Sequence, residues 1–502
     1  MEISQSQTEF QGLPFKSAFR PESVAVIGAS PTFLKWGHMI LTNILAGGYE
    51  GRVFPVNQKE DLICGLSVYK EIGDIPGTVD LAFITIPAGK VAAALEQCGR
   101  KGVKGIVLIT SGFSEADDEG RRLEERIVKI CRQWNMLLIG PNTMGVILPH
   151  SKLFATATHA RPRKGSVAFI SQSGNLGNQL ILWAQQQGIG ISAFVGSGNE
   201  AMINCIDYLE YLEKDPYTRT ILLYIESVGD GRKFLEAARR INRKKPIIVL
   251  KGGRTEAGNN AAASHTGSLG GEANITEAAF RQAGILTSKV PSELLDFSIG
   301  FSCLPLPRGN RVGIVTLGGG WGVVTADGCN EKGLVVPRLP EHIIATIGKY
   351  LPSFWSRGNP VDLVGTRDIE VPVVAVEELL KWEGIDAVIC LGIVGRHELV
   401  RLMIDSARRS DERADSKFLN QVESISSGFE NDYIERVTEL MEKYEKPVIG
   451  VSLARSDKGT ISRVEGKRYK GVFYQTPEDA VNVLAGMVGY NSFLRKRSFY
   501  PL

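Results

Sequence analysis

The feature that most constrains the fold is a local pattern that occurs three times: a short apolar strand runs into a turn of small residues and then into a helical segment. The three copies are VAVIGAS at residues 24–30, VAFISQSGNLG at 167–177 and VGIVTLGGGWG at 312–322. Each opens a block in which apolar strands alternate with amphipathic helices, which is typical of a doubly wound parallel sheet. In a chain of 502 residues, three openings predict three α/β domains of ordinary size.

Two connectors mark the expected domain boundaries. HARPRKG precedes the second block, and LPLPRGN precedes the third. Basic and proline-bearing segments of this kind are typical of linkers. We therefore place three Rossmann- or flavodoxin-like domains at residues 13–150, 163–300 and 311–490.

The charge balance and the cysteines exclude several function classes. The chain has 58 basic and 55 acidic residues, a net charge of +3, so nothing indicates a nucleic-acid or membrane-surface footprint. The seven cysteines are scattered, and no C-x-x-C pair occurs. We therefore expect a reducing compartment and neither a structural disulfide nor a metal site. No signal pattern or bilayer-length apolar run is present, so a cytoplasmic location is expected.

The first glycine turn invites a dinucleotide-binding hypothesis, which the sequence does not support. Gly28 is not followed by the remaining glycines of G-x-G-x-x-G, and the second strand ends in PVNQK, without the acidic residue that binds a ribose hydroxyl. Backbone N–H groups at Gly28, Ala29 and Ser30 still favour an anion, and Lys59 suits an extra phosphate. Coenzyme A is therefore a better candidate than NAD, and a turn that binds nothing stays equally open.

The second turn, SQSGNLG, offers two hydroxyl groups and the N-terminus of a helix to a phosphate. Ser171 and Ser173 lie at the end of a strand, and Gly174 and Asn175 begin the helix. Such a turn suits phosphate or a phosphorylated side chain. Taken alone, the two serines are better explained as helix caps.

Further residues are candidates to act together with this turn. Glu226 directly follows the strand TILLYI, at the end where open α/β sheets bind ligands. A carboxylate there can accept the Nδ1 proton of a histidine and leave Nε2 as the nucleophile, although the sequence alone slightly favours a surface glutamate at a strand end. His265 lies in AAASHTGSLGG, a run of small residues. Lys251 and Arg254, in KGGRTEAG, are candidates for phosphate contacts or for solvated positions.

Several motifs, in one order along the chain, resemble the α subunit of the ADP-forming acyl-CoA synthetases of the acetate–CoA ligase type, relatives of succinyl-CoA synthetase. The resemblance is dense over residues 13–365 and thins toward the C-terminus. It implies a CoA-binding domain, a ligase domain with a phosphorylated histidine and a third flavodoxin-like CoA-ligase domain. The motifs are VAVIGAS, VDLAFITIPAGKV, SGFSE, GPNTMG, SQSGNLG, DGRKFLEAAR, KGGRTEAG, AAASHTGSLGG and FWSRGNPVDLVG.

The resemblance also implies roles for single residues. His265 matches the phosphorylated histidine of the SHTGS motif, and Glu226 matches the glutamate that orients it. The phosphate-holding turn contains Ser171, Ser173, Gly174 and Asn175. The residues expected to face CoA are Gly28, Ala29, Ser30, Pro87, Ser111 and Asn142, with Lys59 as a looser candidate.

The reaction implied by the family converts acyl-CoA, ADP and phosphate reversibly into a carboxylic acid, CoA and ATP, through an acyl phosphate and a phosphohistidine. No segment resembles the ATP-grasp domain that holds ADP, and no G-x-x-x-x-G-K-[ST] loop occurs. We therefore expect a separate ATP-grasp β subunit that binds ADP or ATP with Mg²⁺. A tether rich in Gly, Ala, Ser and Thr suits a histidine that must visit two sites.

Departures from the family pattern leave alternatives open. The GPN motif continues with Thr143 and Met144 in place of the usual cysteine and leucine, and Trp321 stands in the third glycine turn. The main rival hypothesis is a non-catalytic acyl-CoA sensor with the same fold. A CoA-binding accessory of an oxidoreductase is disfavoured by the missing nicotinamide fingerprint. The acyl group is not determined by these motifs.

Overall fold

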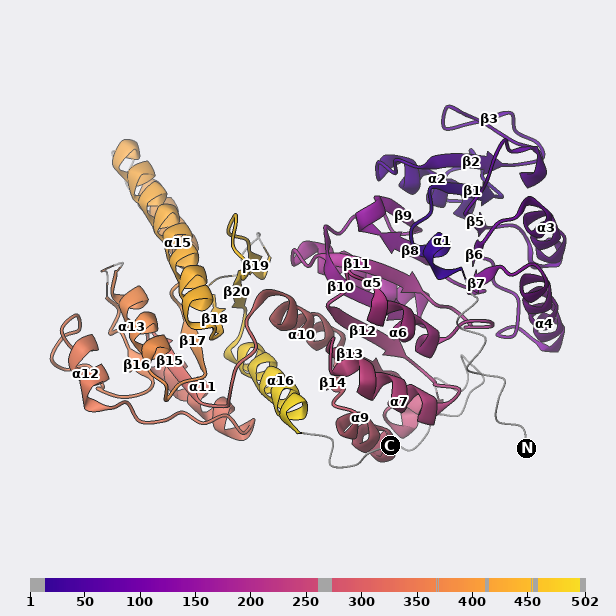
Figure 1. Ribbon diagram of the computed structural model, residues 1–502. Helices are drawn as coiled ribbons and strands as arrows, with labels where there is room; N and C mark the ends of the chain where they lie inside the picture. The colour runs from indigo at the N-terminus through magenta and orange to yellow at the C-terminus, as the bar shows by residue number, and fades with distance from the viewer. Residues whose placement is uncertain are drawn as a thin grey trace. The chain divides into compact units, whose positions relative to one another are not determined.

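The computed structural model of the chain describes residues 14–260, 273–366, 368, 370–410, 415–452, 454 and 459–496. Three β-sheets, each flanked by helices, account for most of these residues (Figure 1). The first two sheets belong to one compact unit that ends at Leu294, and the third belongs to a second unit, which follows from Leu295 and also includes Gln186–Gly188. The predicted α/β class with three doubly wound sheets is confirmed.

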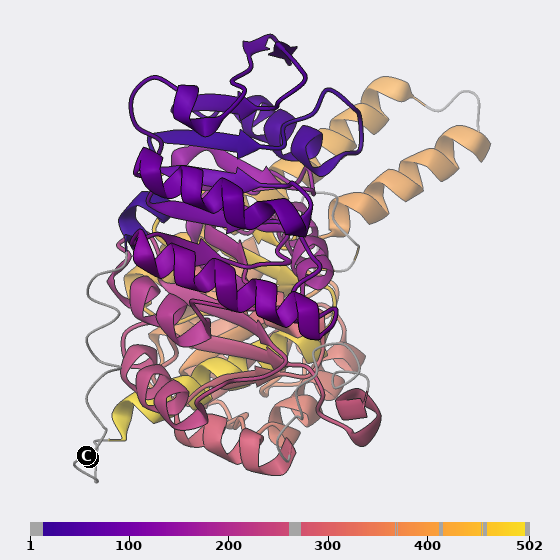
Figure 2. The ribbon, with the colours of Figure 1, turned by 90° about the vertical axis from the view of Figure 1, so that its right-hand side faces the viewer.

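The first sheet has five parallel strands in the order β2-β1-β5-β6-β7. Val24 and Val26 of β1 are buried in one hydrophobic cluster, and Ala25 and Ile27 are buried in another, so both faces of the strand are covered. This explains the uninterrupted apolar run in the sequence. Figure 2 shows α3 and α4 side by side across one face of this sheet. The elements are α1 (Phe15–Phe19), β1 (Ser23–Ile27), α2 (Trp36–Ala46), β2 (Arg52–Val56), the hairpin β3 (Leu62–Ile63) and β4 (Leu66–Ser67), η2 (Ile72–Asp74), β5 (Leu81–Ile84), α3 (Ala88–Lys101), β6 (Gly105–Leu108), α4 (Asp118–Gln133) and β7 (Leu137–Ile139).

The second sheet has seven strands in the order β14-β13-β12-β10-β11-β8-β9. Its parallel strands match the sequence expectation, but the antiparallel pair β8–β9 at its edge was not expected, and β8 begins before the boundary placed at residue 150. The elements are β8 (Gly145–Leu148), η3 (Pro149–Ser151), β9 (Leu153–Thr156), β10 (Lys164–Ser171), α5 (Gly174–Gln186), β11 (Ile191–Gly196), α6 (Cys205–Lys214), β12 (Thr220–Ile225), α7 (Gly231–Asn242), β13 (Ile247–Lys251), α9 (Ala273–Gln282), β14 (Leu286–Ser288) and α10 (Pro291–Cys303).

The third sheet has six strands in the order β16-β15-β17-β18-β20-β19, of which only β19 pairs antiparallel. Trp321, in the first turn of α11, is about half exposed. The elements are β15 (Val312–Thr316), α11 (Gly319–Glu331), α12 (Glu341–Ile347), β16 (Val361–Asp362), α13 (Glu370–Lys381), β17 (Ala387–Leu391), α14 (Arg396–Ser410), α15 (Ser416–Tyr444), β18 (Val448–Val451), β19 (Ile461–Ser462), β20 (Gly471–Tyr474) and α16 (Pro477–Arg495).

Side-chain caps explain where several helices begin. Asp117 accepts a hydrogen bond from the backbone of Gly120 at the start of α4, and Asp230 accepts one from Lys233 at the start of α7. Asn204 and Asp207 form a reciprocal capping box on α6. Each cap satisfies an N–H group that has no partner within its helix and stabilises the helix by about 1 kcal/mol.

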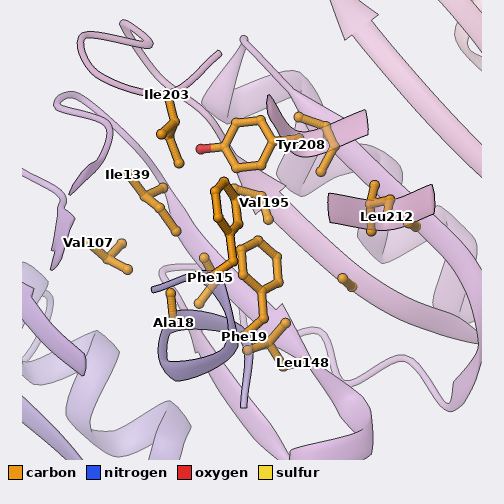
Figure 3. Packing of buried hydrophobic residues seen from close by; sticks show 14 of the residues in the cluster. Phe15, Ala18, Phe19, Val107, Ile139, Leu148, Val195, Ile203, Tyr208 and Leu212 are labelled. Carbon is orange, nitrogen blue, oxygen red and sulfur yellow. The ribbon is translucent and has the colours of Figure 1, made fainter. Parts of the chain in front are cut away.

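The core of the first unit joins its two sheets through the short helix α1. Phe15 and Phe19 are buried, and their rings lie 5.3 and 4.4 Å from the ring of Tyr211 on α6. Figure 3 shows both phenylalanines among buried side chains such as Tyr208 and Leu212 of α6. Burial of side chains of this size contributes roughly 2 kcal/mol each, so the N-terminal helix helps to hold the two sheets together.

Candidate functional site

A pocket of about 520 Å³ lies in the first unit, where strands from both of its sheets end. Residues 85–87 follow β5, residues 109–111 follow β6 and Asn142 follows β7. Residues 172–175, which join β10 to α5, complete this part of the lining. Because open α/β sheets bind ligands at the carboxyl ends of their strands, this pocket is the candidate site.

The pocket brings together residues that the sequence assigned to two different ligands. From the expected CoA-facing set it contains Pro87, Ser111 and Asn142, and from the expected phosphate turn it contains Ser173, Gly174 and Asn175. It also contains side chains that the sequence analysis missed, among them Trp36, Thr85, Thr110, Met144 and Gln172. Thr85, Thr110 and Gln172 follow the apolar runs LAFI, GIVLI and VAFIS, so the strand-end rule could have found them. Trp36 begins a helix, and no pattern marks it.

The phosphate turn is built by tight packing beneath it. Ser171 is buried, and its Oγ donates to the carbonyl oxygen of Ser173 at 2.7 Å. A Cβ atom on Gly174 would lie 2.3 Å from Cγ of Met144. The Ser171 hydroxyl group therefore shapes the turn, whereas Ser173 and the first residues of α5 face the pocket. The unpaired N–H groups at the start of that helix favour an anion there.

The first glycine turn supports the pocket from outside its lining. Gly28 has a φ of 93°, and a Cβ on Gly37 would lie only 1.9 Å from the carbonyl oxygen of Gly28. Ala29 is buried, and Ser30 Oγ accepts a hydrogen bond from the backbone of Thr32 at 3.1 Å. Gly28, Ala29 and Ser30 are absent from the pocket lining, so CoA contacts at this turn stay a prediction.

Lys59 is exposed and is also absent from the lining of this pocket. Its backbone N–H donates to Asn57 Oδ1 at 2.7 Å, and Asn57 Nδ2 donates to the carbonyl oxygen of Ala29 at 2.7 Å. The end of β2 is thereby fastened to the first glycine turn. A contact between the Lys59 ammonium group and a phosphate stays a prediction.

Glu226 occupies the expected position directly after β12, and its side chain is half-buried. Its Oε1 accepts a hydrogen bond from the hydroxyl group of Tyr224 at 3.2 Å. Burial and the charge of Glu226 together hold the pKa of Tyr224 well above its usual value. Lys251 Nζ donates to the carbonyl oxygen of Glu226 at 2.7 Å. Burial lowers the pKa of Lys251, and Glu226 partly offsets that effect.

A polar network joins the loops after β6, β7 and β11. Asn142 Nδ2 donates to Asn199 Oδ1 at 3.3 Å, and Asn199 Nδ2 donates to the carboxylates of Glu115 at 2.5 Å and Glu124 at 2.9 Å. Burial alone would raise the pKa of Glu115, but hydrogen bonds from Asn199 and from the backbone of Gly112 lower it. This network fixes Asn142 at the edge of the pocket.

Three family models match successive parts of the chain. A CoA binding domain matches residues 22–149, a succinyl-CoA ligase like flavodoxin domain matches residues 164–299, and a Ligase-CoA domain matches residues 312–399. The pocket therefore lies between a sheet of the CoA-binding type and a sheet of the ligase type.

Known proteins with these domains include subunits and longer chains. The α subunit of acetate–CoA ligase [ADP-forming] II from Pyrococcus furiosus is 42% identical over 377 residues, which cover 75% of this chain and 82% of that protein. The chain belongs to the family of ADP-forming acetate–CoA ligase α subunits. Another member, acetate–CoA ligase [ADP-forming] of Methanocaldococcus jannaschii, is 43% identical over 69% of this chain, but only 48% of its own length is covered.

A solved structure of the family covers almost the whole α-subunit-type chain. It is acetyl-coenzyme A synthetase 1 of Ca. Korarchaeum cryptofilum in complex with phosphate and ADP, with a TM-score of 0.82 and 33% identity, covering 97% of this chain and 99% of that one. The known relatives are named as enzymes or enzyme subunits. This supports the catalytic hypothesis for the family member described here over the acyl-CoA sensor.

The remaining expected site residues lie outside the pocket or outside the residues that the structure describes. His265 lies among residues 261–272, which are outside the described residues. Arg254 is exposed, and its Nη2 donates to the carbonyl oxygen of Lys289 at 2.5 Å. In the ranges that the structure describes, no group of three or more His, Cys, Asp or Glu residues is placed to hold a metal ion. No described helix is both long enough and apolar enough to span a bilayer.

Proposed function

We propose that this chain is the α subunit of an ADP-forming acyl-CoA ligase that acts in the cytoplasm, and that the pocket between its two sheets is where CoA and phosphate meet. The single observation that carries the proposal is that one pocket is lined by the expected CoA-facing residues Pro87, Ser111 and Asn142 and by the phosphate turn at residues 173–175. A thioester and a phosphate must be adjacent for an acyl phosphate to form.

The chemistry of the lining suits these two substrates. The loops that follow β5 and β6 present the hydroxyl groups of Thr85, Thr110 and Ser111, which can bind the polar parts of CoA. The start of α5 presents backbone N–H groups to a phosphate and stabilises the negative charge that develops on transfer.

The proposed reaction proceeds in three steps. A phosphate oxygen attacks the thioester carbonyl carbon, the C–S bond breaks, and CoA leaves as the thiolate, which takes up a proton. Nε2 of His265 then attacks the phosphorus atom of the acyl phosphate, and the carboxylate leaves. Finally, an oxygen of the ADP β-phosphate attacks the phosphohistidine, which yields ATP and returns the neutral imidazole.

Glu226 is the proposed partner of the imidazole. A carboxylate that accepts the Nδ1 proton holds the tautomer in which Nε2 carries the lone pair, and it stabilises the positive charge on the ring during transfer. Tyr224 and the backbone contacts around Glu226 hold that carboxylate at the end of β12.

We propose that ADP and Mg²⁺ are held by a separate ATP-grasp β subunit in a hetero-oligomer. Two observations support this proposal. The Pyrococcus furiosus relative is named a subunit, and the chain spans about half of the Methanocaldococcus jannaschii ligase, which is not named as one. The described residues form no ATP-grasp domain. The carboxylic acid substrate is a small molecule that an acyl-CoA panel would identify.

The test is to incubate the chain with labelled inorganic phosphate and a panel of acyl-CoA thioesters, starting with acetyl-CoA. We expect label on the protein that is labile in acid and stable in base, and no such label on the His265→Ala variant. Retention of the label by that variant would refute the assignment of the histidine. Absence of label with every thioester, despite CoA binding, would favour the sensor hypothesis.

A further inference from the structure

Gln172 lies at the centre of the strand ends that carry the proposed chemistry. It directly follows β10, which is hydrogen-bonded to β12 on one side and to β11 on the other. Glu226 follows β12, and Glu200 lies in the loop after β11. Gln172 also lines the pocket beside Ser173. Its side chain is therefore adjacent both to the phosphate turn and to Glu226.

The carboxamide of Gln172 is held by backbone groups of the Glu226 segment. Its Oε1 accepts hydrogen bonds from the N–H groups of Glu226 at 2.6 Å and Ser227 at 3.2 Å, and its Nε2 donates to the carbonyl oxygen of Ser227 at 3.0 Å. Backbone N–H groups can only donate and a carbonyl oxygen can only accept, so these three bonds fix which end of the amide is oxygen. A neutral carboxamide is the one common side chain that satisfies all three.

Glu200 lies in the loop after β11, the other neighbour of β10 in the sheet. Its backbone has a φ of 55°, in the left-handed region that few residues with a Cβ adopt, and its Oε2 accepts a hydrogen bond from the backbone N–H of Cys205 at 3.2 Å. Burial raises the pKa of the Glu200 carboxyl group to about 7, against the lowering effect of the Ser197 and Gln172 side chains. The other titratable groups that interact with it are Asp207, Tyr208 and Cys205, all on α6.

We propose that Gln172 is a positioning residue that keeps Glu226 in register with the phosphate turn. The inference rests on the proposed function and adds a residue to it. Loss of the carboxamide frees the backbone of residues 226 and 227 from the turn, so the carboxylate no longer meets the imidazole in one geometry. A misplacement of about 1 Å can slow such a step about a hundredfold.

The first experiment is a double-mutant cycle on the rate of protein labelling from acetyl-CoA and labelled phosphate. Gln172→Met keeps the approximate volume of the side chain and removes its hydrogen bonds. We expect this substitution to slow labelling about a hundredfold in the wild-type chain. In the Glu226→Gln background we expect less than about a twofold further loss, because residues that act through one another are not additive. Equal losses in the two backgrounds would overturn the proposal.

The second experiment measures the pH profile of labelling, which a purely structural role of Gln172 would leave unchanged. In Gln172→Glu, one oxygen can still accept from the two N–H groups, but the other faces the Ser227 carbonyl oxygen. We expect the labelling rate of this variant, relative to that of the wild type, to rise as the pH falls, because the protonated carboxyl group can donate to the Ser227 carbonyl oxygen. A pH profile that matches the wild type would count against the inference.

The two proposals fail in different ways. If the wild-type chain takes no label from any acyl-CoA, the proposed function itself is wrong. If the wild type is labelled, His265→Ala is not, and Gln172→Met is labelled at the wild-type rate, only the role of Gln172 is wrong. Thermal unfolding of each variant, with and without CoA, distinguishes a loss of folding from a loss of positioning.

Discussion

The hydroxyl group of Tyr224 donates a hydrogen bond to Glu226 Oε1 at 3.2 Å, and the two residues lie at the end of the same strand, with one residue between them. Side chains two positions apart along a strand point to the same face of the sheet. The hydrogen bond from Tyr224 therefore holds the Glu226 carboxylate on the face of the sheet to which the Tyr224 side chain points. The group proposed to orient the histidine is thus supported by a neighbouring side chain.

This relationship predicts a graded series. Glu226→Gln should lower the rate of phosphohistidine formation by about a hundredfold to a thousandfold, because the imidazolium charge loses its partner. Tyr224→Phe should lower it by about tenfold, since one hydrogen bond to a charged group is lost. The measurement is the initial rate of labelling at saturating acyl-CoA. If Tyr224→Phe proved as damaging as Glu226→Gln, the tyrosine would have a more direct part in the reaction.

The pocket predicts which of the expected CoA residues matter for binding. Ser111→Ala and Asn142→Ala should each raise the Kd of CoA by about fivefold to tenfold, because each removes a hydrogen-bonding group from the lining. Lys59→Ala is the matched comparison, since the exposed Lys59 is absent from that lining. Calorimetric titration with CoA would measure all three. A larger loss for Lys59→Ala would move the CoA phosphates toward the end of β2.

The first glycine turn predicts a steric effect at Gly37. In Gly37→Ala the new Cβ would meet the carbonyl oxygen of Gly28 at 1.9 Å, so α2 must move away from the turn. We expect a loss of stability of about 2 kcal/mol or more together with weaker CoA binding. Gly73→Ala is the control, because a Cβ at that position has no atom within 4 Å. Denaturant unfolding and CoA titration of both variants would test the prediction, and equal behaviour of the two would contradict it.

In the second unit, the ion pair of Arg311 and Asp386 predicts a dependence of stability on pH. Asp386 is buried and accepts from Arg311 Nε at 2.8 Å and Nη2 at 3.0 Å. Burial alone would raise the pKa of Asp386, but the hydrogen bonds from Arg311 leave it lowered. A lowered pKa stabilises the fold above the pKa of the unfolded carboxyl group, about 4. That stabilisation is lost as the pH falls through the folded pKa.

Asp386→Asn should therefore lower the free energy of unfolding by about 2 kcal/mol at pH 7, and the difference from the wild type should shrink below about pH 4. Glu370→Gln, which breaks the more exposed pair of Glu370 with Arg436, is the control and should have a smaller effect. Denaturant unfolding at both pH values measures the difference. If the difference in free energy of unfolding between the wild type and Asp386→Asn were the same at both pH values, the ion pair would not be the cause of that difference.

Local sequence patterns were sufficient to predict most strands and the sheets to which they belong. The apolar runs VAVI, LAFI and GIVL lie in β1, β5 and β6, because a strand buried on both faces must be apolar throughout. The hairpin β8–β9 was missed as part of the second sheet, since it pairs with β11 across some 50 residues of chain and no local pattern reports such a partner.

The amino-acid sequence by itself determined the fold class and the family, and it predicted a phosphate turn, because turn glycines, capping residues and apolar periodicity act over a few neighbouring residues. Only the tertiary structure decided which of the expected residues share a pocket. It placed Ser111 and Asn142 in one pocket with Ser173, turned the hydroxyl group of Ser171 toward the carbonyl oxygen of Ser173, and joined the Gln172 carboxamide to the backbone of Glu226. Those relationships depend on how strands distant in the sequence are ordered side by side in a sheet, and that order is fixed by packing across the whole unit.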